Sequence, residues 1–293
     1  MSDLTDRLAV QRAAHMLAQP EPLERRKDRL RRAIALVEDN AERICDALSE
    51  DFGHRSREQS MVTDVGGSVG PLRHALKHLD RWGRPDRRRV PFPLGLLGAR
   101  AHVEYRPKGV VGIIAPWNFP VNLIMAPLAG VFAAGNRALV KTSEYTPATA
   151  AVLDDICGTY FSADELAFVS GGPEVGQAFA ALPFDHLIFT GATGIGRHIL
   201  HAAADNLTPV TLELGGKSPV IVGKGADLAR TTERVVLGKM LNAGQICLAP
   251  DYLLVRDEDE QAVVEGLMSA ASVMYPTLID NPDYTSVLGD RHL

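Results

Sequence analysis

Cys247 is the residue of this sequence best suited to nucleophilic chemistry. It lies in the segment NAGQICLAP, between a predicted helix and a predicted strand, with Gly244 and Pro250 on either side. A cysteine in such a turn can be exposed, and its thiolate is a strong nucleophile once it is activated. For any single cysteine a small buried side chain is the simpler interpretation, and we retain it for Cys45 and Cys157, which fall in predicted helices.

Two further side chains could assist a thiol nucleophile. Glu213 follows a β-branched run in VTLELGGKSP; a carboxylate at a strand end can act as a general base near neutral pH, but a salt bridge to Lys217 is an equally good interpretation. Asn118 lies in APWNFP, and its amide can donate a hydrogen bond to a developing oxyanion. It could instead cap the helix that is expected to begin near Pro120. The residues alone leave these alternatives open.

Two segments could bind a dinucleotide. In FTGATGIG, residues 189–196, a strand leads into glycines and then into a helix, whose N-terminal N–H groups can bind a pyrophosphate. The spacing is G-x-x-G-x-G rather than the usual G-x-G-x-x-G, so a tight turn explains the segment equally well. In LVKTSEYTP, Lys141 and Glu144 follow a strand, where an acid can bind ribose hydroxyls. Two exposed loop charges are the alternative there.

The elements that must position these residues are those of an α/β protein. Short β-branched runs alternate with helical stretches from about residue 101 onward, which predicts a parallel sheet covered by helices on both faces. Ligands of such sheets bind beyond the carboxyl ends of the strands, where the candidates fall. The predicted strands are residues 110–115, 138–142, 186–190, 210–214, 220–222 and 252–255, and the predicted helices are residues 121–134, 148–160, 195–204, 228–242 and 260–274.

The N-terminal part is predicted to be helical. Apolar residues recur near helical spacing over residues 23–48, and a second helix is expected over residues 62–82. Residues 81–98 are rich in proline, glycine and arginine, which is typical of a surface connection. The five arginines of that segment could form an anion site, but the run is short and lacks interleaved aromatics.

Composition and charge limit the class of protein. The chain has 293 residues, 46% of them hydrophobic and 23% charged, which indicates a globular protein rather than a disordered chain or a coiled coil. With Lys+Arg 31 and Asp+Glu 36 the net charge is -5, which argues against nucleic acid as a partner. We identify no signal peptide, no membrane span and no metal-ligand motif. Three widely spaced cysteines suggest a reducing compartment, so we expect a cytoplasmic protein.

Five motifs in the order APWNFP, LVKTSE, FTGATGIG, LELGGKSP and GQICLAP resemble the aldehyde dehydrogenase superfamily. DFGHRSREQS and ALPFDHLIFTG are most similar to the branch of coniferyl aldehyde dehydrogenases and class 3 aldehyde dehydrogenases. The resemblance implies N-terminal helices and a Rossmann-like, doubly wound NAD-binding domain over residues 1–213, followed by the start of an α/β catalytic domain over residues 214–293. Family members continue beyond the last residue here, so we expect a C-terminally truncated chain.

The resemblance also implies a role for each candidate residue. Cys247 would attack the aldehyde carbon, Asn118 and the Cys247 backbone N–H would hold the oxyanion, and Glu213 would activate the water that hydrolyses the thioester. The implied reaction is NAD(P)-dependent oxidation of an aromatic or apolar aldehyde to the acid, and the full-length parent would be a homodimer. The residues at cofactor-contacting positions are Trp117, Lys141, Glu144, Thr190, Gly191, Ala192, Gly196 and Leu214.

Three features of the match bear on activity. Glu144 favours NAD, because its carboxylate would repel the additional phosphate of NADP, which remains the alternative cofactor. Ala192 stands where the family commonly has a serine, and losing one hydrogen bond should weaken cofactor binding by about 0.5–1.5 kcal/mol. Because of the expected truncation, a catalytically inactive nucleotide-binding fragment is the alternative to an active enzyme. Glu213 argues against a third alternative, a relative that transfers its acyl group to coenzyme A.

Overall fold

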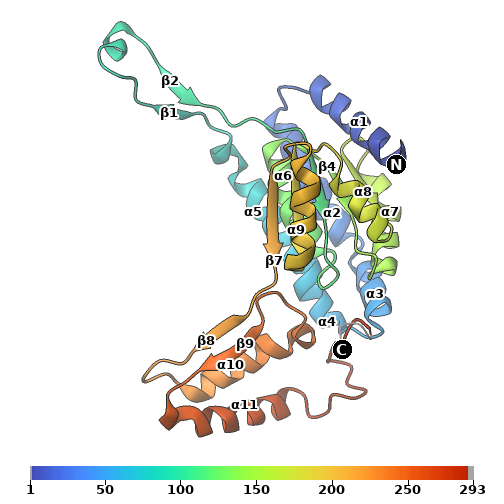
Figure 1. Ribbon diagram of the computed structural model, residues 1–293, viewed down its shortest axis with the longest axis vertical. Helices are drawn as coiled ribbons and strands as arrows, with labels where there is room; N and C mark the ends of the chain where they lie inside the picture. Colours follow the sequence, from blue (N-terminus) through green and yellow to red (C-terminus); the bar gives the residue numbers. More distant parts are fainter. Residues whose placement is uncertain (1, 290–293) are drawn as a thin grey trace.

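A five-stranded parallel sheet forms the centre of the computed structural model, which describes residues 2–289 (Figure 1). Its strands are β3 (Val110–Ile114), β4 (Arg137–Lys141), β5 (Leu166–Val169), β6 (His186–Gly191) and β7 (Val210–Leu214). Their order is β5-β4-β3-β6-β7, so the chain builds outward from β3 in one direction and then continues on its other side. This confirms the predicted doubly wound topology, which has a switch point at the carboxyl end of β3.

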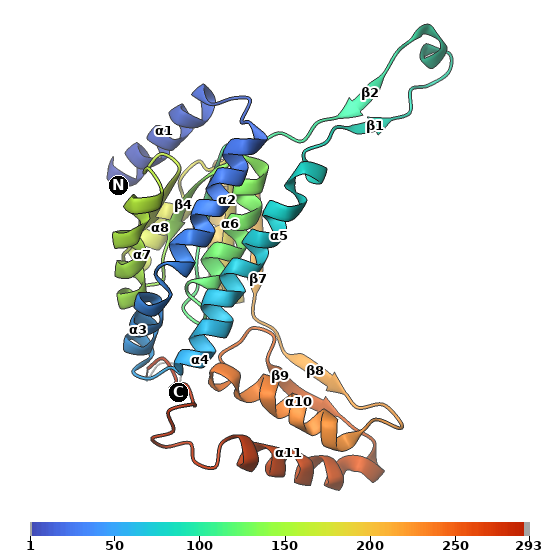
Figure 2. The same cartoon turned by 180° about the vertical axis from the view of Figure 1, so that it is seen from behind.

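Helices cover both faces of the sheet, as the opposite views of Figures 1 and 2 show. Strand residues alternate between two cores: Val111 and Ile113 belong to one, Val110 and Ile114 to the other. Burial on both faces explains why the run VVGII is apolar throughout. The first core also contains residues of α2 (Leu23–Glu38), α3 (Ala41–Phe52), α5 (Gly67–Trp82), α6 (Asn122–Ala134) and α7 (Pro147–Tyr160), and the second contains residues of α1 (Ser2–Leu17), α8 (Pro173–Ala180) and α9 (Thr193–Ala204).

The N-terminal helices are divided differently from the prediction. The stretch 23–48 is not one helix, because α2 and α3 are separated at Asp39 and Asn40. The predicted helix 62–82 is preceded by α4 (Arg57–Ser60) and begins with a π-helical turn (Met61–Gly66) before α5. Such turns are rare and often lie at functional sites.

The segment predicted as a surface connection forms a projecting arm (Figure 1). β1 (Asp86–Arg88) and β2 (Ala101–Val103) pair antiparallel, and a 3-10 turn (Leu94–Leu97) lies between them. The prediction of exposure is confirmed, but the strand pairing was missed. Strands of three residues are too short for alternation to be detected.

A second, smaller sheet follows β7. Its two parallel strands are β8 (Ser218–Ile221) and β9 (Pro250–Leu254), and its helices are α10 (Leu228–Met240) and α11 (Glu260–Met274). Ile221, Tyr252 and Leu254 are 75%, 46% and 52% exposed on these strands. The domain boundary between residues 213 and 214 stays a prediction. Within residues 2–289, no helix is both long and apolar enough to cross a membrane.

Candidate active site

The carboxyl ends of the parallel strands meet at one edge of the main sheet and carry most of the candidate residues. In the strand register Ile114 lies beside Lys141, and Thr190 lies beside Glu213. Trp117 and Asn118 follow β3 directly, at the switch point, and both are partly buried. The predicted clustering of the candidates at this edge therefore has a structural basis.

Asn118 is held against the loop that carries Cys247. Its Nδ2 donates to the backbone O of Gln245 (3.0 Å), two residues before the cysteine. Its own carbonyl O accepts from Arg55 Nη1 (3.0 Å) and Asn242 Nδ2 (3.1 Å). The helix-capping alternative is not found, because α6 begins further along the chain and has no side-chain cap. The amide has a second N–H, which can donate a hydrogen bond to a ligand.

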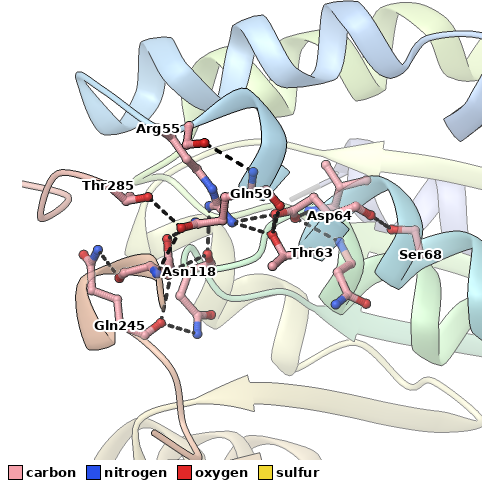
Figure 3. A network of polar contacts seen from close by, with 12 residues as sticks. Arg55, Gln59, Thr63, Asp64, Ser68, Asn118, Gln245 and Thr285 are labelled. Atoms are coloured by element: carbon pink, nitrogen blue, oxygen red, sulfur yellow. Dashed lines mark hydrogen bonds and ion pairs between the residues drawn. The ribbon is translucent and has the colours of Figure 1, made fainter. Parts of the chain in front are cut away.

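The start of α6 is bonded to another element. Asp64, in the π-helical turn, accepts the backbone N–H groups of Val121 (3.2 Å) and Asn122 (3.3 Å) through Oδ1. Its Oδ2 accepts from Arg55 Nη2 at 2.6 Å (Figure 3), and both side chains of this ion pair are fully buried. Burial raises the pKa of Asp64 and lowers the pKa of Arg55, while their mutual attraction opposes both changes. The loop after β3 is thus bonded to the Cys247 loop through Asn118 and to Asp64 where it enters α6.

Cys247 is exposed, whereas Cys45 and Cys157 are buried. Burial raises the pKa of the Cys45 thiol to about 11 and that of the Cys157 thiol to about 12. Their thiolates are therefore scarce at neutral pH, and the thiolate is the reactive form. The interpretation of these two cysteines as buried side chains is confirmed, which leaves Cys247 as the accessible thiol.

Three consecutive residues with left-handed backbone precede the Cys247 loop. Asn242 has φ 54° and ψ 32°, Ala243 has φ 53° and ψ 30°, and Gly244 has φ 75°. For a residue with a β-carbon this conformation costs roughly 1–2 kcal/mol. Such strain persists only where the surroundings hold it, and it concentrates at active sites. The strained turn just before Cys247 is therefore held in place by its surroundings.

Glu213 lies on the edge strand β7 with its side chain exposed. The alternative ion pair with Lys217 is not found: Lys217 Nζ pairs with Asp251 Oδ1 (3.0 Å), and among residues 2–289 Glu213 has no ion-pair partner. Three residues further on, an added β-carbon at Gly216 would lie 3.5 Å from the Cys247 carbonyl O. The segment after Glu213 thus passes against the cysteine loop.

Lys141 and Glu144 form an ion pair at the end of β4. Lys141 Nζ lies 2.6 Å from Glu144 Oε2, and the two side chains are 3% and 32% exposed. The alternative of two exposed loop charges is therefore wrong for Lys141. A buried ammonium beside a partly exposed carboxylate offers a donor and an acceptor, as ribose hydroxyls require.

The motif FTGATGIG forms the end of β6 and the first turn of α9. The N–H of Gly196 bonds to Ala192 O (2.9 Å), so the N–H groups of residues 193–195 begin the helix without helical partners. These residues are exposed, whereas Gly196 is buried, and a β-carbon on it would lie 3.0 Å from Leu214 Cδ2. Gly196 thus allows α9 to pack closely on β7, as a glycine does in dinucleotide-binding folds. Thr190 and Gly191 end β6 beside this turn.

Part of this edge is not predicted by the sequence. β5 and α8 lie in residues 161–185, for which no element was predicted. Thr142, just after β4, donates through its backbone N to Val169 O (3.0 Å), and its Oγ1 lies 3.2 Å from Ser170 Oγ. The SGGP segment after β5 therefore lies beside the Lys141 region. Pro173 in the first turn of α8 was the available indication of a helix start.

The described candidates thus form two groups. Asn118 bonds to the Cys247 loop at Gln245, and the segment after Glu213 passes against the same loop at Gly216. Lys141, Glu144 and the start of α9 lie along the carboxyl edge of the main sheet. Residues 2–289 contain no cluster of His, Cys, Asp and Glu side chains suited to a metal ion. The arrangement suits thiol chemistry beside a nucleotide site.

Comparison with known proteins identifies the family of the chain. The family model described as "Aldehyde dehydrogenase family" matches residues 6–285. The chain is 54% identical over 290 residues to a probable coniferyl aldehyde dehydrogenase of Caulobacter vibrioides, covering 99% of this chain and 60% of that protein. It is 53% identical to a coniferyl aldehyde dehydrogenase of a Pseudomonas species, covering 95% and 57%. The chain thus spans about 60% of the length of these curated relatives.

Solved structures show the same fold. The substrate-bound AldH of Staphylococcus aureus superposes with a TM-score of 0.91 at 33% identity, covering 97% of this chain and 62% of that one. Pseudomonas syringae AldC, solved as a cysteine-to-alanine mutant with NAD+ and octanal, gives a TM-score of 0.86 at 26% identity, with 99% and 59% covered. Together with the family match over most of its length, these likenesses show that the chain belongs to the aldehyde dehydrogenase family.

Proposed function

We propose that this chain carries the nucleotide-binding part and the nucleophile of an enzyme that oxidises an aldehyde to the carboxylic acid with NAD. The observation that carries the proposal is the hydrogen bond from Asn118 Nδ2 to Gln245 O (3.0 Å), which places an amide donor two residues from the exposed thiol. A nucleophile and an oxyanion donor at the switch point of a doubly wound sheet are the parts that this reaction needs.

Cys247 Sγ would attack the carbonyl carbon and form a thiohemiacetal. The carbonyl oxygen gains negative charge in this step, and the Asn118 amide and the Cys247 backbone N–H would stabilise it. A single oxyanion-hole donor contributes about 2.7–4 kcal/mol in comparable sites. Asn118 suits this role because its backbone carbonyl accepts hydrogen bonds from Arg55 and Asn242, which hold the residue in position.

Glu213 would act after oxidation, when an acyl group is joined to Cys247 as a thioester. Its unpaired, exposed carboxylate can take a proton from water as that water attacks the thioester carbon. The thiolate of Cys247 then leaves, and the acid is released. Because water is the acceptor, a base in this position favours hydrolysis over transfer to coenzyme A.

The nucleotide would bind along the carboxyl edge of β4, β3 and β6. NAD, when bound, supplies the hydride acceptor for the thiohemiacetal. The free N–H groups at the start of α9 suit a pyrophosphate, and Lys141 with Glu144 suits the ribose hydroxyls. A carboxylate at that position favours NAD over NADP by charge repulsion. Trp117, Thr190, Gly191, Ala192, Gly196 and Leu214 complete the proposed contacts.

The proposed substrate is an aromatic or apolar aldehyde of the coniferyl aldehyde type. Two relatives with 53–54% identity over nearly the whole chain carry that name, which supports the substrate class. The homodimer and the cytoplasmic location stay predictions.

The experiment is NADH formation by the purified chain with coniferyl aldehyde, alongside Cys247→Ala and Glu213→Gln. We expect turnover for the wild type, none for Cys247→Ala, and a single burst of NADH without turnover for Glu213→Gln. NADH formation by Cys247→Ala at the wild-type rate would refute the mechanism. NAD binding with no cysteine-dependent oxidation would favour the nucleotide-binding fragment.

A further inference from the structure

Asn242 is buried, and each of its polar groups is hydrogen-bonded to Gln59, Asn118 or Gln245, which are labelled in Figure 3. Its backbone N–H donates to Gln59 Oε1 (3.1 Å), and its Oδ1 accepts from Gln59 Nε2 (3.1 Å). Its Nδ2 donates to Asn118 O (3.1 Å) and Gln245 O (3.3 Å), and its carbonyl O accepts from Gln245 Nε2 (2.9 Å). The left-handed turn before Cys247 is therefore held by partners outside the turn.

Gln59 joins three parts of the chain that are far apart in sequence. It lies on the short helix α4, where its own N–H donates to Ser56 Oγ (3.4 Å). Its amide pairs with Asn242 in the turn before Cys247, and its Oε1 also accepts from Thr285 Oγ1 (3.0 Å) near the end of the described chain. One side chain thus connects the N-terminal helices, the cysteine loop and the C-terminal segment.

We infer that Gln59 and Asn242 are positioning residues, which together hold the Cys247 loop at the separation from Asn118 that thiol addition requires. This inference rests on the proposed function of Asn118 and Cys247. The two residues act through the backbone of residues 242–245 and through the Asn118 carbonyl. Arg55 Nη1 donates to the same carbonyl (3.0 Å), so Asn118 is fixed while Gln59 sets where the loop meets it.

A purely structural role would lower stability but would leave the relative reactivity of Cys247 unchanged. Two reactions of the thiol separate these possibilities, and neither requires NAD. Iodoacetamide alkylates the thiolate by displacing iodide, with no oxyanion. p-Nitrophenyl acetate acylates it: the S–C bond forms, p-nitrophenolate leaves, and the carbonyl oxygen is transiently an oxyanion. The ratio of acylation rate to alkylation rate therefore reports how well Asn118 is placed relative to Cys247.

The test uses the 293-residue chain with Gln59→Met, which removes all three hydrogen bonds of the side-chain amide at nearly constant length. We expect acylation to slow by at least about tenfold, toward the Asn118→Ala value, because an oxyanion donor is misplaced. Alkylation should change by less than about twofold, since it needs no such donor. The matched control is Gln261→Met: Gln261 is exposed on α11, its side chain bonds to Glu265 Oε1 (2.7 Å), and both rates should match the wild type.

Asn242→Gly tests the side chain of Asn242 separately from its backbone conformation. Glycine adopts left-handed backbone without steric cost, so this variant keeps the turn and loses the amide. We expect its acylation-to-alkylation ratio to fall as in Gln59→Met. A ratio equal to that of the wild type in both variants would overturn the inference, while a low ratio in Asn118→Ala would show that the proposed function itself stands.

If Asn118→Ala also leaves the ratio unchanged, the oxyanion role proposed for Asn118 fails, and hydrogen exchange decides the positioning role. The Asn242 N–H donates to Gln59 Oε1, so we expect it to be protected from exchange in the wild type. Loss of that protection in Gln59→Met would support the holding of the loop by Gln59. Unchanged protection would overturn the positioning role of Gln59.

Discussion

The buried ion pair between Arg55 and Asp64 should dominate the stability of the helix layer beside the site. Asp64→Asn keeps the shape of the side chain and an oxygen that can accept the Val121 and Asn122 N–H groups. It places an NH2 group, or an uncharged oxygen, against Arg55 Nη2, which now lies 2.6 Å from Oδ2. The arginine, whose side chain is fully buried, would lose its counter-charge.

The expected loss in the free energy of unfolding is about 3–5 kcal/mol, which is the cost of removing one partner from a buried pair. This is a large part of the roughly 5–15 kcal/mol that stabilises an ordinary domain. The assay is urea unfolding followed by circular dichroism, in which the midpoint falls while the slope stays constant.

The matched control is Glu38→Gln. Glu38 Oε1 pairs with Arg73 Nη2 at the same 2.6 Å, but the two side chains are 41% and 65% exposed. A pair of this kind contributes about 0.2–1 kcal/mol. If Asp64→Asn changed the free energy of unfolding no more than Glu38→Gln does, the reasoning from burial would be refuted.

Other contacts lead to three more predictions. Burial raises the pKa of Glu165, but hydrogen bonds and charge from Arg32 and Arg29 outweigh this effect and lower the pKa from 4.5 to about 2. The ionised carboxylate therefore stabilises the folded state by up to about 3 kcal/mol. This stabilisation is complete above pH 4.5 and is lost as the pH falls toward 2. Glu165→Gln should therefore flatten the dependence of Tm on pH between about 4.5 and 2, and an unchanged slope would contradict this. At pH 8, iodoacetamide should label Cys247 and spare Cys45 and Cys157, whose pKa values are about 11 and about 12; peptide mapping that found native Cys157 labelled as fast as Cys247 would contradict the described burial. Gly196→Val should lower stability by about 1–3 kcal/mol through overpacking and weaken NAD binding, because even its β-carbon would lie 3.0 Å from Leu214 Cδ2. The control is Gly194→Ala, where a β-carbon meets nothing within 4 Å, and this variant should leave Tm unchanged.

Much of the fold could be predicted because buried parallel strands appear as continuous apolar runs. The VVGII strand and the alternation after it indicate a doubly wound sheet, and the sheet order agrees. β5 was missed because its four residues, LAFV, carry no periodicity that separates a strand from part of a helix. Its position beside β4 follows from long-range pairing.

The candidate site was predicted as a set of residues, but not as an arrangement. Gln59 and Asn242 are 183 positions apart, and neither belongs to a pattern that points to the other. The left-handed turn had a partial indication, because asparagine favours that conformation, whereas alanine at position 243 does not. Contacts such as Asn118 to Gln245 O are set by the packing of whole elements, which local propensity does not contain.

The central claim is that Cys247 is acylated by an aldehyde in an NAD-dependent step. Mass spectrometry of Glu213→Gln, mixed with coniferyl aldehyde and NAD, tests it directly, since that variant should accumulate the thioester. We expect an adduct on the Cys247 peptide equal to the mass of the aldehyde less two hydrogens, absent without NAD and absent from Cys247→Ala. An adduct confined to another residue, or no adduct while NADH is formed, would contradict the assignment of Cys247 as the nucleophile.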